Sequence, residues 1–165
     1  MQATTARTHR QSADEALTAL RARTEGTGID SSDLESLFDL ALEEMRAGRI
    51  DRAFPLFGLL TLSRPADKRF MYGLGQAHRA AGRDDAAGLT FLFLNMLHPG
   101  EAQYELDIAD CLLRLKKPDA ATPVLQRMLD RLDADPQAKD GPIAQRGRAL
   151  LELLSRKGKT DAAAQ

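Results

Sequence analysis

The stretch LALEEMRAGRIDRAFPLFGLLTLSRP, residues 40–65, is followed 34 positions later by LGQAHRAAGRDDAAGLTFLFLNMLHP, residues 74–99. At this offset both stretches carry the same residue at nine positions. These are Leu40, Ala47, Gly48, Arg49, Asp51, Ala53, Phe57, Leu60 and Pro65 of the first copy. The chain therefore contains an internal repeat, and its period indicates the fold more reliably than the pattern of any single segment.

Each repeated residue type suits one place in a helix–turn–helix unit. Gly48 ends a first helix, because glycine tolerates the left-handed conformation needed there. The small Ala53 lets a second helix approach the first closely, and Phe57 with Leu60 fills the space between them. Pro65 stops the second helix. This order and a period of 34 are those of the tetratricopeptide repeat.

A third unit continues the frame with one departure at its turn. Apolar and small residues recur at the expected places, but Lys116 replaces the turn glycine and Pro118 opens the second helix. The recurring residues are Ala109, Leu112, Ala121, Leu125 and Met128. The predicted fold is all-α: an α-solenoid of three tandem tetratricopeptide repeats over residues 31–132.

Further elements flank the repeats. Residues 1–30 are expected to be a flexible N-terminus that holds a short amphipathic helix, 13–23, with a possible part in dimerisation. Ser32 and Glu35 have the spacing of a capping box at the start of the first repeat. Beyond the repeats we expect a linker at 133–141, a capping helix at 142–157 and a disordered tail at 158–165.

Composition narrows the function. The 165 residues suffice for one domain, and 43% hydrophobic with 28% charged residues is an ordinary globular balance. A net charge of −1 offers no field to attract nucleic acid. The longest apolar stretch, 91–97, is too short for a membrane span, so stable membrane insertion is not expected. One cysteine and a polar N-terminus favour a reducing cytoplasm.

The first helix of each repeat lines the concave side of such a stack. The buried stripe of these helices should run through Leu37, Leu40 and Ala41, and then through Met71, Leu74 and Gly75. A second stripe is half apolar, which predicts a ligand: apolar pockets for side chains, and polar groups for the backbone of an extended peptide. The predicted peptide-binding residues are Phe38, Leu42, Met45, Arg69, Tyr72, Gln76, Arg79, Leu106, Asp110 and Leu113. Alternatively, Phe38, Leu42 and Met45 of the first repeat pack against the N-terminal helix or another copy of the chain.

Three stretches exceed the general tetratricopeptide pattern: residues 29–38, residues 69–77 with Gly82, and residues 109–113. In these stretches the chain resembles the class II type III secretion chaperones of Gram-negative bacteria. The resemblance covers roughly 13–132 and implies a cytoplasmic chaperone that holds hydrophobic translocator proteins by an extended, proline-containing segment. It also implies a homodimer formed through the N-terminal helix and first repeat. The family's aromatic pocket is reduced here to Phe38.

Two alternative functions remain compatible with the sequence, and one apolar segment has two possible interpretations. The chain could be a generic tetratricopeptide adaptor between folded partners, or a structural component of the export machinery. Residues 90–97, TFLFLNML, are more apolar than the resemblance leads us to expect. They could form a second contact surface, although we favour a well-buried second helix.

No residues have the arrangement of an enzyme or a cofactor site. Gly73 and Gly75 lack the third glycine and preceding strand of a nucleotide fingerprint. His78 and His98 stand apart, without the spacing of metal ligands. Cys111 has no neighbouring base in the sequence and is expected to be a buried helical cysteine. We therefore expect no catalytic activity, no cofactor and no metal.

Overall fold

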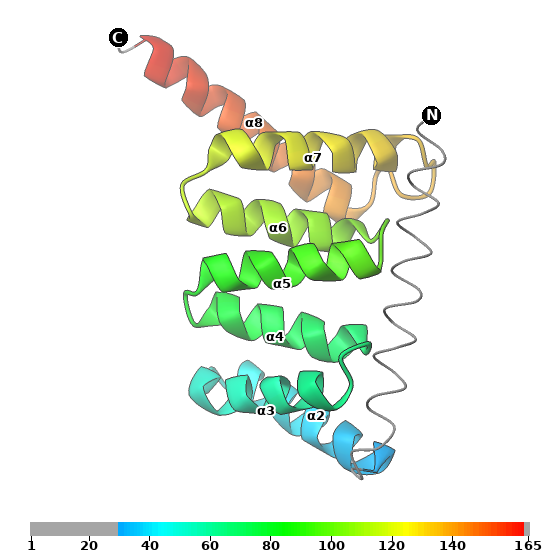
Figure 1. The fold of residues 1–165 in the computed structure, drawn as a ribbon. Coiled ribbons are helices and arrows are strands. Elements are labelled where there is room, and N and C mark those ends of the chain that lie inside the picture. Colours follow the sequence, from blue (N-terminus) through cyan, green and yellow to red (C-terminus); the bar gives the residue numbers. More distant parts are fainter. Residues whose placement is uncertain (1–29, 164–165) are drawn as a thin grey trace. The chain divides into compact units, whose positions relative to one another are not determined.

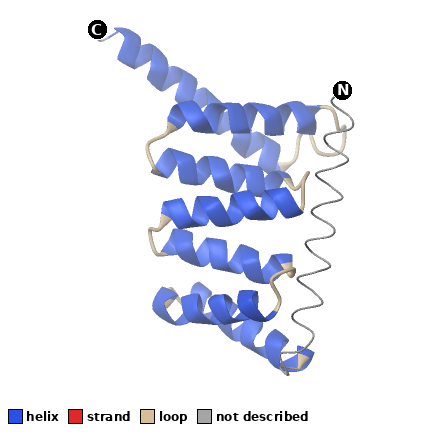
Figure 2. Ribbon diagram, in the orientation of Figure 1, coloured by secondary structure: helices blue, strands red, loops and turns tan. Residues whose placement is uncertain are grey.

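The structure, a computed structural model, describes residues 30–163. Every regular element within that range is an α-helix, as Figure 2 shows, which confirms the predicted fold class. The chain divides into two compact units, residues 1–99 and 100–165. The predicted N-terminal helix, 13–23, lies outside the described residues.

The described part of the first unit, residues 30–99, contains four helices, labelled α2 to α5 in Figure 1. Consecutive helices pack against each other, so that α3 and α4 each have a neighbour on two sides. Their bounds are α2 Ser31–Arg46, α3 Ile50–Ser63, α4 Lys68–Ala80 and α5 Asp84–Leu97. The fully buried Phe57, Leu60 and Phe70 are central to one core cluster, and Phe91 and Leu94 are buried in α5.

The same turn follows the first helix of every repeat. Gly48 donates its N–H to Met45, and the next residue, Arg49, donates to Glu44, which is the Schellman arrangement that ends many helices. Gly82 repeats this pattern, and both glycines have φ of +72°. In the third repeat Lys116 takes the same place with φ of +58°. The repeat frame derived from the sequence is thus correct at the turns, including the one that lacks glycine.

Helix α4 approaches both of its neighbours closely through two glycines. A Cβ atom at Gly73 would lie 2.1 Å from Cε1 of Phe57 in α3. A Cβ atom at Gly75 would lie 2.6 Å from Cε1 of Phe91 in α5. Both rings are fully buried. The glycines therefore provide the space in which these rings pack, rather than conformational freedom.

The second unit contains α6 Ala102–Arg114, α7 Pro118–Asp133 and α8 Pro142–Ala163. Helix α7 packs against both α6 and α8, around a core that includes Leu125, Met128 and Leu129. Gly147 of α8 lies directly over the side chains of Met128 and Leu129. Helix α8 continues to Ala163, past the predicted end at 157, so most of the segment expected to be disordered is helical.

Two local predictions in the first unit were wrong. The N-cap of α2 is Asp30, whose carboxylate accepts the N–H of Ser31, while Glu35 pairs with Arg69 rather than completing a capping box with Ser32. Leu40, placed in the buried stripe, is 43% exposed. Its counterpart in the next repeat, Leu74, is partly buried because α4 packs between two helices, whereas no described helix precedes α2.

Candidate functional site

The ten predicted peptide-binding residues fall in both units. Phe38, Leu42 and Met45 are on α2, and α4 carries four more, Arg69, Tyr72, Gln76 and Arg79. The remaining three, Leu106, Asp110 and Leu113, are on α6 of the second unit.

The α2 group is anchored on the aromatic core of the first unit. Phe38 is half-buried, with its ring 6.2 Å from Phe57 at a steep angle and 5.3 Å from Phe70. Leu42 and Met45 are also half-buried and pack against the same core. One side of each therefore contacts the core of its own unit. The other side of each remains accessible. The alternative, packing against the N-terminal helix, involves a segment outside the described residues.

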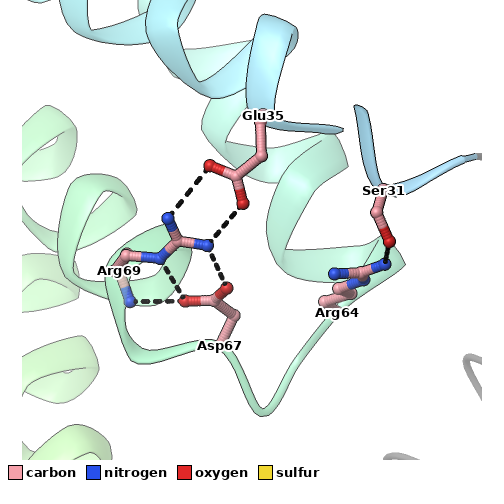
Figure 3. A network of polar contacts seen from close by, with 5 residues as sticks. All are labelled: Ser31, Glu35, Arg64, Asp67 and Arg69. Carbon is pink, nitrogen blue, oxygen red and sulfur yellow. Dashed lines mark hydrogen bonds and ion pairs between the residues drawn. The ribbon is translucent and has the colours of Figure 1, made fainter. Parts of the chain in front are cut away.

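Arg69 lies at the junction of α2 and α4 and has little hydrogen-bonding capacity left (Figure 3). It donates to both carboxylate oxygens of Glu35, at 2.7 and 3.0 Å, and to both of Asp67, at 2.8 and 3.1 Å. Four of its five guanidinium N–H groups are thereby used. Its carbon Cζ also lies 5.3 Å from the ring centre of Phe38, within the range of a cation–π contact.

These contacts shift the acid–base equilibria of the pair. The hydrogen bonds from Arg69 hold the pKa of Glu35 below its usual value of 4.5. Hydrogen bonds to Asp67 and then to Glu35 raise the pKa of Arg69. Both side chains are about half exposed, so the pair orients Arg69 more than it stabilises the fold. We therefore assign Arg69 to positioning Phe38 and holding α2 against α4.

The remaining α4 residues form one continuous polar and aromatic cluster. Tyr72 packs against Phe91, with ring centres 5.7 Å apart, and Arg79 lies 5.8 Å from the centre of the same ring. Arg79 also donates to the side-chain carbonyl of Gln76. All three α4 residues are half-buried. They share one face of the helix because residues three and four apart are neighbours on its surface.

The α6 group in the second unit is less open than predicted. Leu106 is buried in the core of this unit, so its predicted place on an open surface is wrong. Asp110 accepts a hydrogen bond from Arg146 of α8, and Leu113 is half-buried against the core. Leu106 occupies the core because α8 packs on α6 and α7. The repeat pattern alone does not include α8.

Comparison with known proteins gives consistent results. No protein-family model matches the chain. The low calcium response locus protein H of Yersinia pestis is 30% identical over 86 residues, which are 52% of this chain. The same protein of Yersinia pseudotuberculosis matches equally, and the chain spans about half the length (51%) of either relative.

Solved structures match over more of the chain. The type III secretion chaperone SycD of Yersinia enterocolitica, in complex with a peptide of the translocator YopD, has a TM-score of 0.70 and 26% identity. The match covers 80% of this chain and 99% of SycD. PcrH of Pseudomonas aeruginosa gives 0.69 and 26%, over 78% and 96% of the two chains. PcrH with the chaperone-binding region of PopB gives 0.67 and 26%, over 75% and 98%.

The chain has the fold of the type III secretion translocator chaperones. The resemblance inferred from residues 29–38, 69–77 and 109–113 is thereby confirmed. The second helices of this fold carry an exposed apolar surface, which for residues 90–97 was the less favoured of the two alternatives considered above.

Six large apolar side chains are exposed on these second helices, and we call them the outer stripe. The outer stripe consists of Leu59, Leu62, Leu89, Leu92, Phe93 and Met96. The prediction that residues 90–97 form a well-buried helix was wrong, because α5 buries only Phe91 and Leu94 of that run. The signal was present in the sequence: a helix apolar on nearly every side has a second surface to cover.

Other chemistry is not indicated in the part of the chain that the structure describes. Cys111 is buried, as predicted. Residues 30–163 contain no cluster of three or more His, Cys, Asp or Glu side chains placed to hold a metal ion. Within the same range no helix has the length and hydrophobicity required to cross a bilayer.

Proposed function

We propose that this chain is a cytoplasmic type III secretion chaperone that binds an extended, proline-containing segment of a hydrophobic translocator protein and keeps it soluble before export. The observation that carries the proposal is the 26% identity, over most of both chains, to chaperones whose structures contain translocator segments. The proposal includes no catalysis and no cofactor.

The first unit supplies the principal binding surface in this proposal. Phe38, Leu42 and Met45 provide an apolar patch on α2, and Tyr72 extends it on α4. Gln76 and Arg79 present amide and guanidinium groups that can hydrogen-bond the backbone of an extended segment. Arg69, already bonded to two carboxylates, fixes the position of Phe38 instead of recognising a client carbonyl.

The second unit contributes a smaller surface. Asp110 and Leu113 remain candidates for client contact, whereas the burial of Leu106 removes it as a direct contact. The mechanism is competitive burial: while an apolar client segment is covered by the chaperone, it cannot join its own oligomer or a bilayer. Because export requires release, the complex must be reversible.

We also propose that the chain forms a homodimer, since SycD has been solved as a dimer. Light scattering on the purified full chain, with and without client, tests this part separately. A monomer at all concentrations would overturn it without affecting client binding.

The function is tested by co-expressing the full chain with each translocator encoded in the same genome, followed by affinity capture and limited proteolysis. We expect a soluble complex in which one proline-containing client segment is protected. Capture of an unrelated folded protein, with no translocator retained, would instead support the adaptor function.

A further inference from the structure

Arg146 of α8 lies beside the candidate client surface on α6, within the second unit. Its guanidinium group donates to the carboxylate of Asp110. The side chain of Asp110 is 13% exposed, whereas that of Arg146 is 57% exposed. A mostly buried carboxylate therefore holds the guanidinium group in place and leaves much of it accessible. Leu113, one turn further along α6, is the other candidate for client contact in this unit.

Arg146 retains the hydrogen-bonding capacity that Arg69 has used. Within the part of the chain that the structure describes, the side chain of Arg146 donates to Asp110 and to no other residue, so four of its five N–H groups can bind a further acceptor. Arg69 joins two carboxylates, those of Glu35 and Asp67. Arg146 holds one carboxylate and has the donors to hold a second.

Apolar side chains follow Arg146 along α8. Leu150 and Leu153 are four and seven residues further on, so all three side chains lie on one face of the helix. Leu150 is half-buried against the same core as Leu113, and Leu153 is 61% exposed. The second unit thus combines a donor group with apolar side chains that rest on the core, as the first unit does around Phe38.

The charge of this face of α8 favours an anionic group. Residues 142–151 contain two basic residues, Arg146 and Arg148, and no acidic residue. The first acidic residue of α8, Glu152, is paired with Arg156. A basic client side chain would meet exposed guanidinium groups of its own charge. A carboxylate would instead accept N–H groups in the planar arrangement for which arginine is suited.

We propose that Arg146 determines client specificity by binding a carboxylate of the translocator segment, while Leu150 and Leu153 contact an apolar side chain next to it. The inference rests on the proposed function and deepens it, because it adds α8 to the binding surface. The added surface is continuous with Asp110 and Leu113 on α6. The client segment that it selects carries Asp or Glu beside apolar residues.

Overlapping short peptides that tile the translocators encoded in the same genome are the probe. Each peptide that contains Asp or Glu is paired with a version in which these residues are Asn or Gln. Binding of both versions is measured to the full wild-type chain, to Arg146→Gln and to Arg148→Gln. Arg148 is the matched control because it lies on the other side of the same helix and also pairs with one carboxylate, that of Asp133.

We expect wild type to bind the amide version of its best peptide about fivefold more weakly than the acidic version, as for one charge-assisted hydrogen-bonded pair. Arg146→Gln should bind both versions equally, and Arg148→Gln should behave like wild type. Discrimination by Arg146→Gln equal to that of wild type, or bound peptides that lack Asp and Glu, would overturn the inference and leave the proposed function in place. If no peptide bound wild type, the proposed function would be refuted and the inference with it.

The readout separates recognition from stability, because partial unfolding of a variant weakens binding of both peptide versions equally. Leu153→Ser tests the apolar part of the surface without touching the ion pair. Since Leu153 is exposed, the thermal melt should be unchanged, and both peptide versions should bind several-fold more weakly. Wild-type affinity in Leu153→Ser would contradict the assignment of Leu153 to the client surface.

Discussion

Replacement of Gly73 by alanine tests how closely α4 packs against α3. The added Cβ atom would lie 2.1 Å from Cε1 and 2.4 Å from Cδ1 of Phe57, well inside van der Waals contact. The Phe57 ring cannot move aside cheaply, because it is fully buried and packs against Phe38. Overpacking of a core typically costs about 1–3 kcal/mol. The better helix propensity of alanine returns about 0.5–1 kcal/mol. We expect a net loss of about 1–2 kcal/mol.

Gly58 provides the matched control within the same unit. It lies inside α3, and a Cβ atom there would meet nothing within 4 Å. Gly58→Ala should therefore stabilise the protein by about 0.5–1 kcal/mol through helix propensity alone. Urea denaturation followed by far-UV circular dichroism measures both changes, and the melting temperature should move about 2–4 °C per kcal/mol for a chain of this size. If Gly73→Ala were as stable as Gly58→Ala, the argument from close helix packing would be refuted.

Three further predictions concern a turn, a helix cap and an ion pair. Lys116→Gly should stabilise the protein by about 1 kcal/mol, since residue 116 is left-handed, and a thermal melt below the wild-type value would contradict this. Asp30→Ala should lower the stability by about 1 kcal/mol because Asp30 is the N-cap of α2, whereas Ser32→Ala should be close to neutral in the same melts. A larger loss for Ser32→Ala than for Asp30→Ala would contradict this N-cap assignment and favour the capping box of Ser32 and Glu35. Because Arg69 lowers the pKa of Glu35, the stabilising contribution of that carboxylate is complete above pH 4.5 and is lost as the pH falls through the lowered pKa. Glu35→Gln should therefore be less stable than wild type at neutral pH and low salt, and the difference should shrink in acid.

The repeat frame was predictable because its signals are local. Gly48 and Gly82 mark a turn that requires positive φ, and Pro65 and Pro99 mark the ends of second helices. Even Lys116 was identified correctly as a turn residue, since the 34-residue spacing placed it there. Such features depend on a few neighbouring residues and on period, both of which are present in a single sequence.

Contacts between distant residues were not predictable in the same way. Glu35 was assigned to a capping box, but a bidentate pair with Arg69, 34 residues away, is the stronger interaction for a carboxylate. Leu106 was assigned to a surface because the repeat pattern contains no equivalent of α8, which packs on α6. The exposure of Leu40 likewise depends on what covers the first helix. These outcomes depend on which helices become neighbours, and the repeat period does not specify that at the ends of the array.

How well the positions of the predicted binding residues could be predicted depends on what their side chains contact. Tyr72, Gln76 and Arg79 are brought together on α4, as helical spacing requires. Phe38 is both a core residue and a surface residue, a dual role that periodicity cannot reveal. For the α5 part of the outer stripe the wrong alternative was favoured, because an apolar run is compatible with either burial or a second contact, and only the packing of α5 distinguishes the two.

The most direct test of the proposed function is a titration of the protected translocator segment, as a labelled synthetic peptide, into the wild-type chain and into the double variant Phe38→Ala with Tyr72→Ala. Leu62→Ala, on the outer stripe, is the control, and circular dichroism verifies that all three proteins remain helical. Loss of two aromatic anchors should weaken binding at least tenfold, since about 1.4 kcal/mol corresponds to a factor of ten and each anchor typically contributes that much or more. Saturable binding by wild type and the control, with this loss in the double variant, is the predicted result; equal affinity in all three, or no binding by wild type, would contradict it.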